Sequence, residues 1–269
     1  MCPASLIRDY VPGVGDAIVW KWSGVPFSGG LTVPPNGFSV GDLMQVGLKT
    51  FILCLLASAI TSTGLGVKMA YAQGAPYAVA GATSAVGATS VTITTTAASG
   101  PAGDGAVAKD WFKGGQIVLF TAGSDIPQVR GITGNTSRVA SGAKNVTFYL
   151  DSPLTTAITV AVDYGEAIAS MGMGVLQDTE IGHPVLGMPM SVGTSGQYIW
   201  VQTYGPIFAS PQSGVGVAGA TGVYWRHDGS LDVLDTTDAY ISGQYAGFVM
   251  AESATHTQAA PFVFLQGVR

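Results

Sequence analysis

The chain has 269 residues, of which 10% are charged, and its formal net charge is −5. Ordinary soluble domains carry charge at about 25% of their positions, so a chain with 38 glycines and this little charge is expected to bury much of its surface against other protein. With only 11 Lys and Arg residues, the composition argues against a dedicated nucleic-acid-binding protein, which needs a basic stripe to neutralise phosphates.

Residues 1–38 contain five prolines and six glycines within a short stretch that has little hydrophobic periodicity. Because proline lacks an amide hydrogen and breaks helices, this segment predicts an extended N-terminal arm with one strand at residues 17–22. The arm holds Trp20, Trp22 and Phe27 but has no core of its own, so these three are candidate interface residues. Two interpretations stay open: the arm lies along a neighbouring subunit, or it wraps the domain of its own chain.

Residues 39–60 predict one short apolar helix. Ser39 is a suitable N-cap, and Asp42 stands where the acid of a capping box is expected. An apolar run follows, and no charged residue occurs between Lys49 and Lys68. We expect this helix to be buried against a β domain.

Two other interpretations of the same run are a transmembrane helix and an internal signal peptide. A transmembrane helix needs about 20 mostly apolar residues, whereas the apolar part here covers only residues 51–60. Phe51 and Leu55 in this run are candidate interface residues. Whether the run faces its own core or another subunit stays open.

Residues 76–170 predict a β meander. Short runs rich in β-branched and aromatic residues occur at 90–96, 115–120, 128–132, 145–150 and 157–162. Turn-forming residues separate them, as at Gly134-Asn135 and at residues 151–153.

The last third of the chain predicts further strands around residues 196–206, 222–233 and 243–250. Asp228-Gly229 between two such runs is a strong hairpin signal, because glycine accepts a positive φ without a Cβ clash. Aromatic residues are concentrated here, and they fit either core and subunit-interface packing, which we favour, or a shelf on which sugars stack. The candidate interface residues of this region are Trp200, Tyr204, Trp225 and Tyr245.

The predicted fold is therefore mainly β: a β-barrel or β-sandwich body with an extended N-terminal arm and one short apolar helix. The predicted regions are the arm at 1–38, the apolar helix and its connection at 39–75, the β meander at 76–170, and a C-terminal barrel or sandwich region at 171–269.

Residue patterns that would support catalysis are weak. The three histidines, His183, His227 and His256, lie far apart and lack partners at metal-ligand spacing. The glycines of residues 214–219 match the dinucleotide-binding pattern, but the segment leads toward a hairpin instead of a helix.

Two groups of acids are the nearest candidates for paired carboxylates. They are Asp163 with Glu166, and Asp232 with Asp235 and Asp238, and we interpret both as solvated turn acids. We expect no enzymatic activity, no catalytic residue, no cofactor and no bound metal.

Cys2 and Cys54 are the only cysteines. We interpret them as two reduced thiols, with Cys54 a small core residue, and a disulfide between them is the alternative.

Several turns and strand starts together resemble virion structural proteins of tailed bacteriophages. The matching residues are 115–118, 128–136, 150–157, 200–206 and 262–265. The resemblance implies a capsid decoration or cement protein, located on the capsid surface of the virion. Its implied partners are the major capsid protein and neighbouring copies of the chain, with no direct contact to nucleic acid or membrane. The alternative is a carbohydrate-binding or host-attachment module on the virion surface, for which the partner is a glycan.

Overall fold

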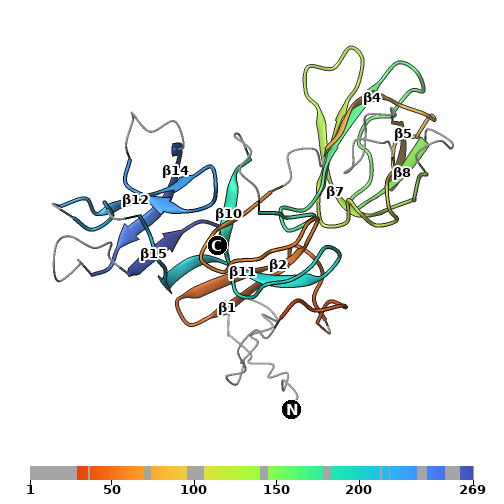
Figure 1. Ribbon diagram of the computed structural model, residues 1–269. Helices are drawn as coiled ribbons and strands as arrows, with labels where there is room; N and C mark the ends of the chain where they lie inside the picture. Colours follow the sequence, from red (N-terminus) through yellow and green to blue (C-terminus); the bar gives the residue numbers. More distant parts are fainter. Residues whose placement is uncertain are drawn as a thin grey trace, which may run out of the picture. The chain divides into compact units, whose positions relative to one another are not determined.

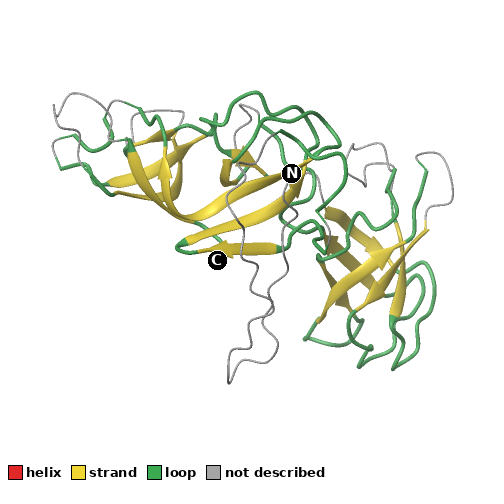
Figure 2. Ribbon diagram, turned by 90° about the horizontal axis from the view of Figure 1, so that it is seen from below, coloured by secondary structure: helices red, strands yellow, loops and turns green. Residues whose placement is uncertain are grey.

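The computed structural model describes residues 29–35, 37–69, 74–95, 106–139, 145–177, 183–212, 214–217, 219–234, 241–251 and 261–268. Throughout these ranges the secondary structure is β, with no helix (Figure 2). The chain divides into two compact units: unit 1 comprises Met1–Met69 and Val175–Arg269, and unit 2 comprises Ala70–Gly174. Unit 2 is thus inserted into the sequence of unit 1. The mainly β prediction is confirmed, whereas the strand predicted at 17–22 lies outside the described residues.

Unit 2 is a nearly closed antiparallel barrel of six strands in the order β4-β9-β6-β7-β8-β5 (Figure 1). A bridge between Ala80 and Ile93, with the Gly81 amide donating to the Thr92 carbonyl at 2.9 Å, brings the two outermost strands together. The strands are β4 (Gly74–Val79), β5 (Ser90–Thr94), β6 (Gln116–Phe120), β7 (Gln128–Asn135), β8 (Asn145–Leu150) and β9 (Tyr164–Ile168).

The barrel strands form because their apolar residues alternate. In β5, β6, β8 and β9 every second side chain is buried, which is the period expected of strands with one face on a core. Inside the barrel Phe112 meets Phe148 edge to face, with ring centroids 5.4 Å apart. The strands predicted at 90–96, 115–120, 128–132 and 145–150 are confirmed.

The strand predicted at 157–162 is wrong. Ile158 makes only an isolated bridge to Ser84, and the chain then turns, with Ala161 at a φ of 60°. The buried carboxylate of Asp163 stabilises this turn, because it accepts hydrogen bonds from the amides of Thr159 (2.6 Å) and Ala122 (2.7 Å). The actual strand, β9, begins after this turn.

Unit 1 is built on a nine-stranded antiparallel sheet with the main order β1-β2-β11-β15-β14-β12-β13; β10 pairs with both β11 and β3. Figure 1 shows β11 beside β2, with β15, β14 and β12 continuing the sheet. The strands are β1 (Leu43–Val46), β2 (Lys49–Leu55), β3 (Val67–Lys68), β10 (Val185–Pro189), β11 (Tyr198–Phe208), β12 (Gly222–Arg226), β13 (Leu231–Asp232), β14 (Ile241–Val249) and β15 (Phe262–Gln266).

The short apolar helix predicted within 39–60 is wrong, because this segment forms the β1–β2 hairpin. Gly47, at a φ of 59°, opens a two-residue turn that pairs Val46 with Lys49. The Ser39 amide does donate to the Asp42 carboxylate at 2.7 Å, as in a capping box, but here the bond closes a turn before β1. Among the described residues there is no helix of the length and hydropathy needed to cross a membrane.

The β2 strand resembles a helix in sequence because both of its faces are buried. On one face Phe51 and Leu53 pack with Met44 and Trp200, and Phe38 joins them partly buried. The opposite face contributes to a second cluster, which contains Ile52, Cys54, Leu56, Ile60, Val67, Val175, Leu186, Ile199 and Val201. A strand covered on both sides shows a continuous apolar run with no period of two.

The last residues of the predicted arm belong to the body of unit 1. Leu31 and Tyr198 exchange two backbone hydrogen bonds of 2.8 and 2.7 Å. The ring of Phe38 meets Trp200 edge to face at 5.0 Å. Residues 29–38, as far as the structure describes them, therefore pack on their own chain.

Strand β11 links the two halves of the unit 1 sheet through a β-bulge between Gln202 and Tyr204. The Gln202 side chain is fully buried, and its Nε2 donates to the carbonyls of Tyr204, Gly205 and Pro206 at 3.0–3.2 Å. These bonds connect the Gln202 side chain to the backbone that follows the bulge.

The β12–β13 hairpin confirms the turn predicted at Asp228-Gly229. Gly229 has a φ of 84°, and its amide donates to the Arg226 carbonyl at 3.0 Å. Its carbonyl accepts a 2.7 Å hydrogen bond from the Gly66 amide, so the turn is held against the chain that enters β3. A Cβ at Gly229 would lie 2.5 Å from the Gly66 carbonyl oxygen.

We predict that Gly229→Ala lowers the free energy of unfolding of unit 1 by about 3 kcal/mol or more, because backbone strain and a backbone clash add. Gly196→Ala is the matched control, since Gly196 has a φ of 79° and open space at its Cβ position. Its cost is expected to be about 1–2 kcal/mol, from strain alone. Urea unfolding followed by tryptophan fluorescence measures both, and equal effects would contradict the packing of Gly229 on Gly66.

Candidate interaction surface

The acids and histidines that are candidates for catalysis do not form one site within the described part of the chain. Asp163 is buried, and its carboxylate accepts hydrogen bonds from two backbone amides. Glu166 lies on the outer side of β9. His227 is in the hairpin turn, and Asp235, Asp238 and His256 lie outside the described ranges. Among the residues that the structure describes, no group of three His, Cys, Asp or Glu side chains is close enough to hold a metal ion.

Cys54 is a free, fully buried cysteine of the unit 1 core. Burial raises the pKa of its thiol far above the ordinary value, so the reactive thiolate does not form. The prediction that Cys54 is a reduced core residue is confirmed, and Cys2 lies outside the described residues.

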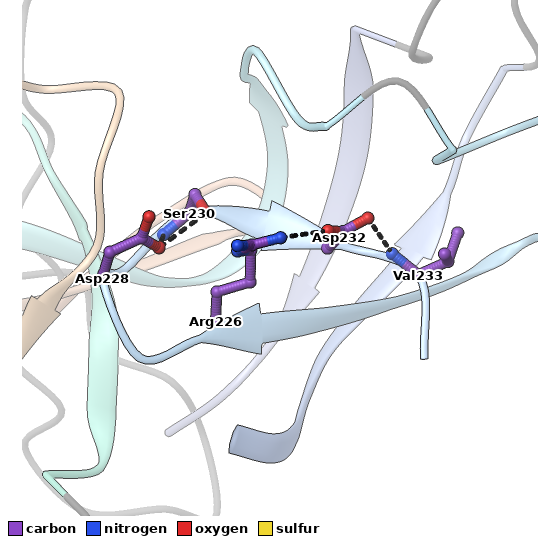
Figure 3. A network of polar contacts seen from close by, with 5 residues as sticks. All are labelled: Arg226, Asp228, Ser230, Asp232 and Val233. Atoms are coloured by element: carbon purple, nitrogen blue, oxygen red, sulfur yellow. Dashed lines mark hydrogen bonds and ion pairs between the residues drawn. The ribbon is translucent and has the colours of Figure 1, made fainter. Parts of the chain in front are cut away.

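The charged groups of the β12–β13 hairpin form a local network, shown in Figure 3. Arg226 Nη1 donates to Asp232 Oδ2 at 2.9 Å, and Asp232 Oδ1 accepts from the Val233 amide at 2.8 Å. Asp228 Oδ1 accepts from both the amide and the hydroxyl of Ser230, at 2.9 and 2.7 Å. These acids stabilise a turn and an edge of the sheet, and they show no paired-carboxylate geometry.

The pKa of Asp228 is lowered. Burial raises this pKa, but the two hydrogen bonds from Ser230 and the positive charges of Arg226 and His227 together outweigh that effect. The ionised form is therefore the one that the folded hairpin favours.

The described part of unit 1 carries an aromatic face on the outer side of β11, β15, β14 and β12. The register places Phe208 opposite Phe262 and Phe248 opposite Phe264, all on one side of the sheet. The inner side of the same strands carries the buried cluster that includes Val223, Trp225, Val263 and Leu265. The aromatic face comprises Tyr204, Phe208, Tyr224, Tyr245, Phe248, Met250, Phe262 and Phe264.

Rings on the aromatic face contact one another and yet remain open to solvent. Phe248 stacks on Phe264 with centroids 5.2 Å apart and an angle of 9°, and Tyr204 meets Phe264 edge to face at 5.0 Å. Two further edge-to-face pairs are Phe208 with Phe262 and Tyr224 with Tyr245. The exposed fractions are 69% for Phe208, 50% for Met250, 49% for Phe262, 43% for Tyr245 and 37% for Phe248. An exposed apolar area of this kind is typical of an interaction site.

Unit 2 carries a second exposed apolar area, on the outside of β6, β7 and β9. Phe120 pairs with Tyr164 across the strands, and Val118 lies between Val129 and Glu166. We call this area the barrel patch; it comprises Val118, Phe120, Val129, Tyr164, Glu166 and Ile168.

The predicted interface residues have three different placements. Phe51, Trp200 and Trp225 lie inside the cores of unit 1, and Leu55 is partly buried at the end of β2. Tyr204 and Tyr245 lie on the aromatic face. Trp20, Trp22 and Phe27 are outside the described residues.

Sequence reasoning missed the phenylalanines that dominate the aromatic face, namely Phe208, Phe248, Phe262 and Phe264. The signal available was the alternation of Phe262 and Phe264 with Val263 and Leu265, two apolar sets on opposite sides of one strand. A strand whose two sides are both apolar can be buried on both sides, or it can be buried on one side and exposed on the other. The sequence alone does not distinguish these cases.

Comparison with protein-family models, curated proteins and solved structures finds no match to this chain.

We predict that Asp228 contributes stability at neutral pH that is lost in acid. A carboxyl whose pKa is lower in the folded state stabilises the fold above its unfolded pKa, about 3.9 for Asp, and ceases to do so as the pH falls through the folded pKa. Asp228→Asn keeps the acceptor oxygen and removes the charge, and it should cost less than about 1 kcal/mol at pH 7, because the group is partly exposed.

Urea unfolding of both proteins at neutral and acidic pH measures this effect. The difference between wild type and variant should be full above about pH 5 and shrink below about pH 4. A difference that does not change with pH would contradict a role for the charge.

Proposed function

We propose that this chain is a structural virion protein that binds the outside of a tailed-phage capsid and reinforces it as a decoration or cement protein. The observation that carries the proposal is the pair of exposed apolar sheet faces, one on each unit. A chain with two separate contact areas can bridge two partners, which is what a cement protein must do, and repetition on a shell adds avidity to modest single contacts.

Three further features support this proposal. The described elements of both units are all β-strands, which suits a rigid β body. The charged fraction of 10%, against about 25% in ordinary soluble domains, fits a chain that buries much of its surface against other protein. The resemblance to virion structural proteins covers residues of both units, from the barrel strands to β11 and β15.

The second candidate is a carbohydrate-binding module on the virion surface. It is favoured by Tyr204, Tyr224 and Tyr245, because each offers a ring for stacking and a hydroxyl for hydrogen bonds. The phenylalanines that separate these tyrosines have no polar group, which favours a protein partner over a sugar. A glycan array probed with the purified chain tests this candidate, and specific binding that Tyr245→Ala abolishes would establish it.

We predict that the chain co-sediments with capsids assembled from the capsid protein of its own virus, and that the barrel patch contributes to the contact. Phe120→Asp and Ile168→Asp should each weaken binding at least about tenfold, because a buried unpaired carboxylate is costly. Val86→Asp is the matched control, since Val86 is an exposed apolar residue of unit 2 outside the patch. It should bind as the wild type does.

Two results would count against the proposal. Absence of co-sedimentation by the wild type at micromolar concentration would remove the capsid as a partner. Full binding by both patch variants would remove the barrel patch from the contact. A chain that begins at residue 29 tests the arm separately, because it keeps Leu31 and Phe38, which pack on unit 1.

A further inference from the structure

The aromatic face and the barrel patch differ in charge, and this difference indicates which partner each can accept. Every side chain of the aromatic face is uncharged. Beside Tyr224, on β12 and β13, Arg226 and Asp232 neutralise each other in a 2.9 Å ion pair. The barrel patch, in contrast, includes the carboxylate of Glu166, which is paired with Val118 on the neighbouring strand.

A two-fold contact presents the same surface from both sides, so the surface must itself supply a partner for every charge that it buries. Two barrel patches placed together would bury two Glu166 carboxylates, and the residues of the patch include no cation to pair with them, which is costly. Two aromatic faces placed together bring only rings and a methionine side chain into contact. The aromatic face is therefore compatible with itself, and the barrel patch is not.

The exposed area is sufficient for a self-contact. Aromatic side chains of this size offer about 150–250 Å² each, so the exposed fractions of Phe208, Met250, Phe262, Tyr245 and Phe248 correspond to about 500 Å² on each copy. Two copies would bury about 1,000 Å² in total, which reaches the lower limit for a specific interface.

We propose that the aromatic face of unit 1 binds the same face of a second copy, forming a two-fold homodimer. This leaves the barrel patch of each copy for a different protein, one that offers a cationic group to Glu166. The inference assigns a partner to one of the two faces of the proposed function, but dimerisation itself does not depend on a capsid.

Sedimentation equilibrium of the full chain tests this proposal. We expect twice the chain mass, with a dissociation constant in the micromolar range that is common for small apolar interfaces. Phe208→Asp and Phe262→Asp should raise the dissociation constant at least about 100-fold, because the two-fold axis doubles the number of buried carboxylates. Phe120→Asp on the barrel patch is the matched control and should leave the dimer intact.

Phe208→Ser covers the case in which an Asp variant fails to fold. It removes a ring at a 69% exposed position without adding charge, and it should weaken the dimer about tenfold. A wild-type chain that stays monomeric up to about 100 µM would overturn the proposal, and so would a dimer that withstands both Asp substitutions in folded protein.

The capsid experiment has a separate readout. If dimers form but capsids are not bound, the proposed function fails and this inference stands. If the chain binds capsids but remains a monomer, this inference fails and the proposed function stands.

Discussion

The β-bulge in β11 is the constraint on which the architecture of unit 1 depends. Before the bulge, β11 lies between two apolar clusters and pairs with β2; after it, the strand pairs with β15 and carries the aromatic face. One buried amide, that of Gln202, stabilises the change of direction through three hydrogen bonds to nearby carbonyls. Gly205 follows with a φ of 96° and passes close to the Leu48 carbonyl, where a Cβ would lie 2.2 Å from the oxygen. The bulge therefore requires both a side-chain amide and a residue without a side chain.

Much of the strand content could be predicted, and the errors have physical causes. Strands β5, β6 and β8 have one buried face, so their alternation is visible in the sequence. Strand β2 is buried on both faces, so its apolar run has no period and looks like a helix. Residues 157–162 have strand propensity, but the carboxylate of Asp163 binds two backbone amides and stabilises a turn there instead. A tertiary hydrogen bond of that kind cannot be read from local propensity.

The interaction surface was harder to predict than the fold, because composition identifies aromatic residues but not the side on which they lie. Trp200 on β11 and Trp225 on β12 are buried. Tyr204, also on β11, and Tyr245, on the neighbouring strand β14, lie on the aromatic face. In a regular strand the parity of the position would separate these groups. The bulges at Gln202/Tyr204 and at Val223/Tyr224 each shift the pairing by one residue, and such a shift exchanges the two faces.

The insertion of unit 2 has a consequence for synthesis on the ribosome. Strands β1 to β3 emerge first, but β11, which pairs with β2, and β10, which pairs with β3, follow only after the whole of Ala70–Gly174. At 5–20 residues per second this delay is about 5–20 s, whereas the barrel has all its strands available before unit 1 does. During that interval one edge of β2 lacks its partner strand, and an unpaired apolar strand edge is prone to aggregation. The sheet of unit 1 therefore cannot be completed until β10 to β15 have been synthesised, and the barrel is the first of the two units to have all its strands available.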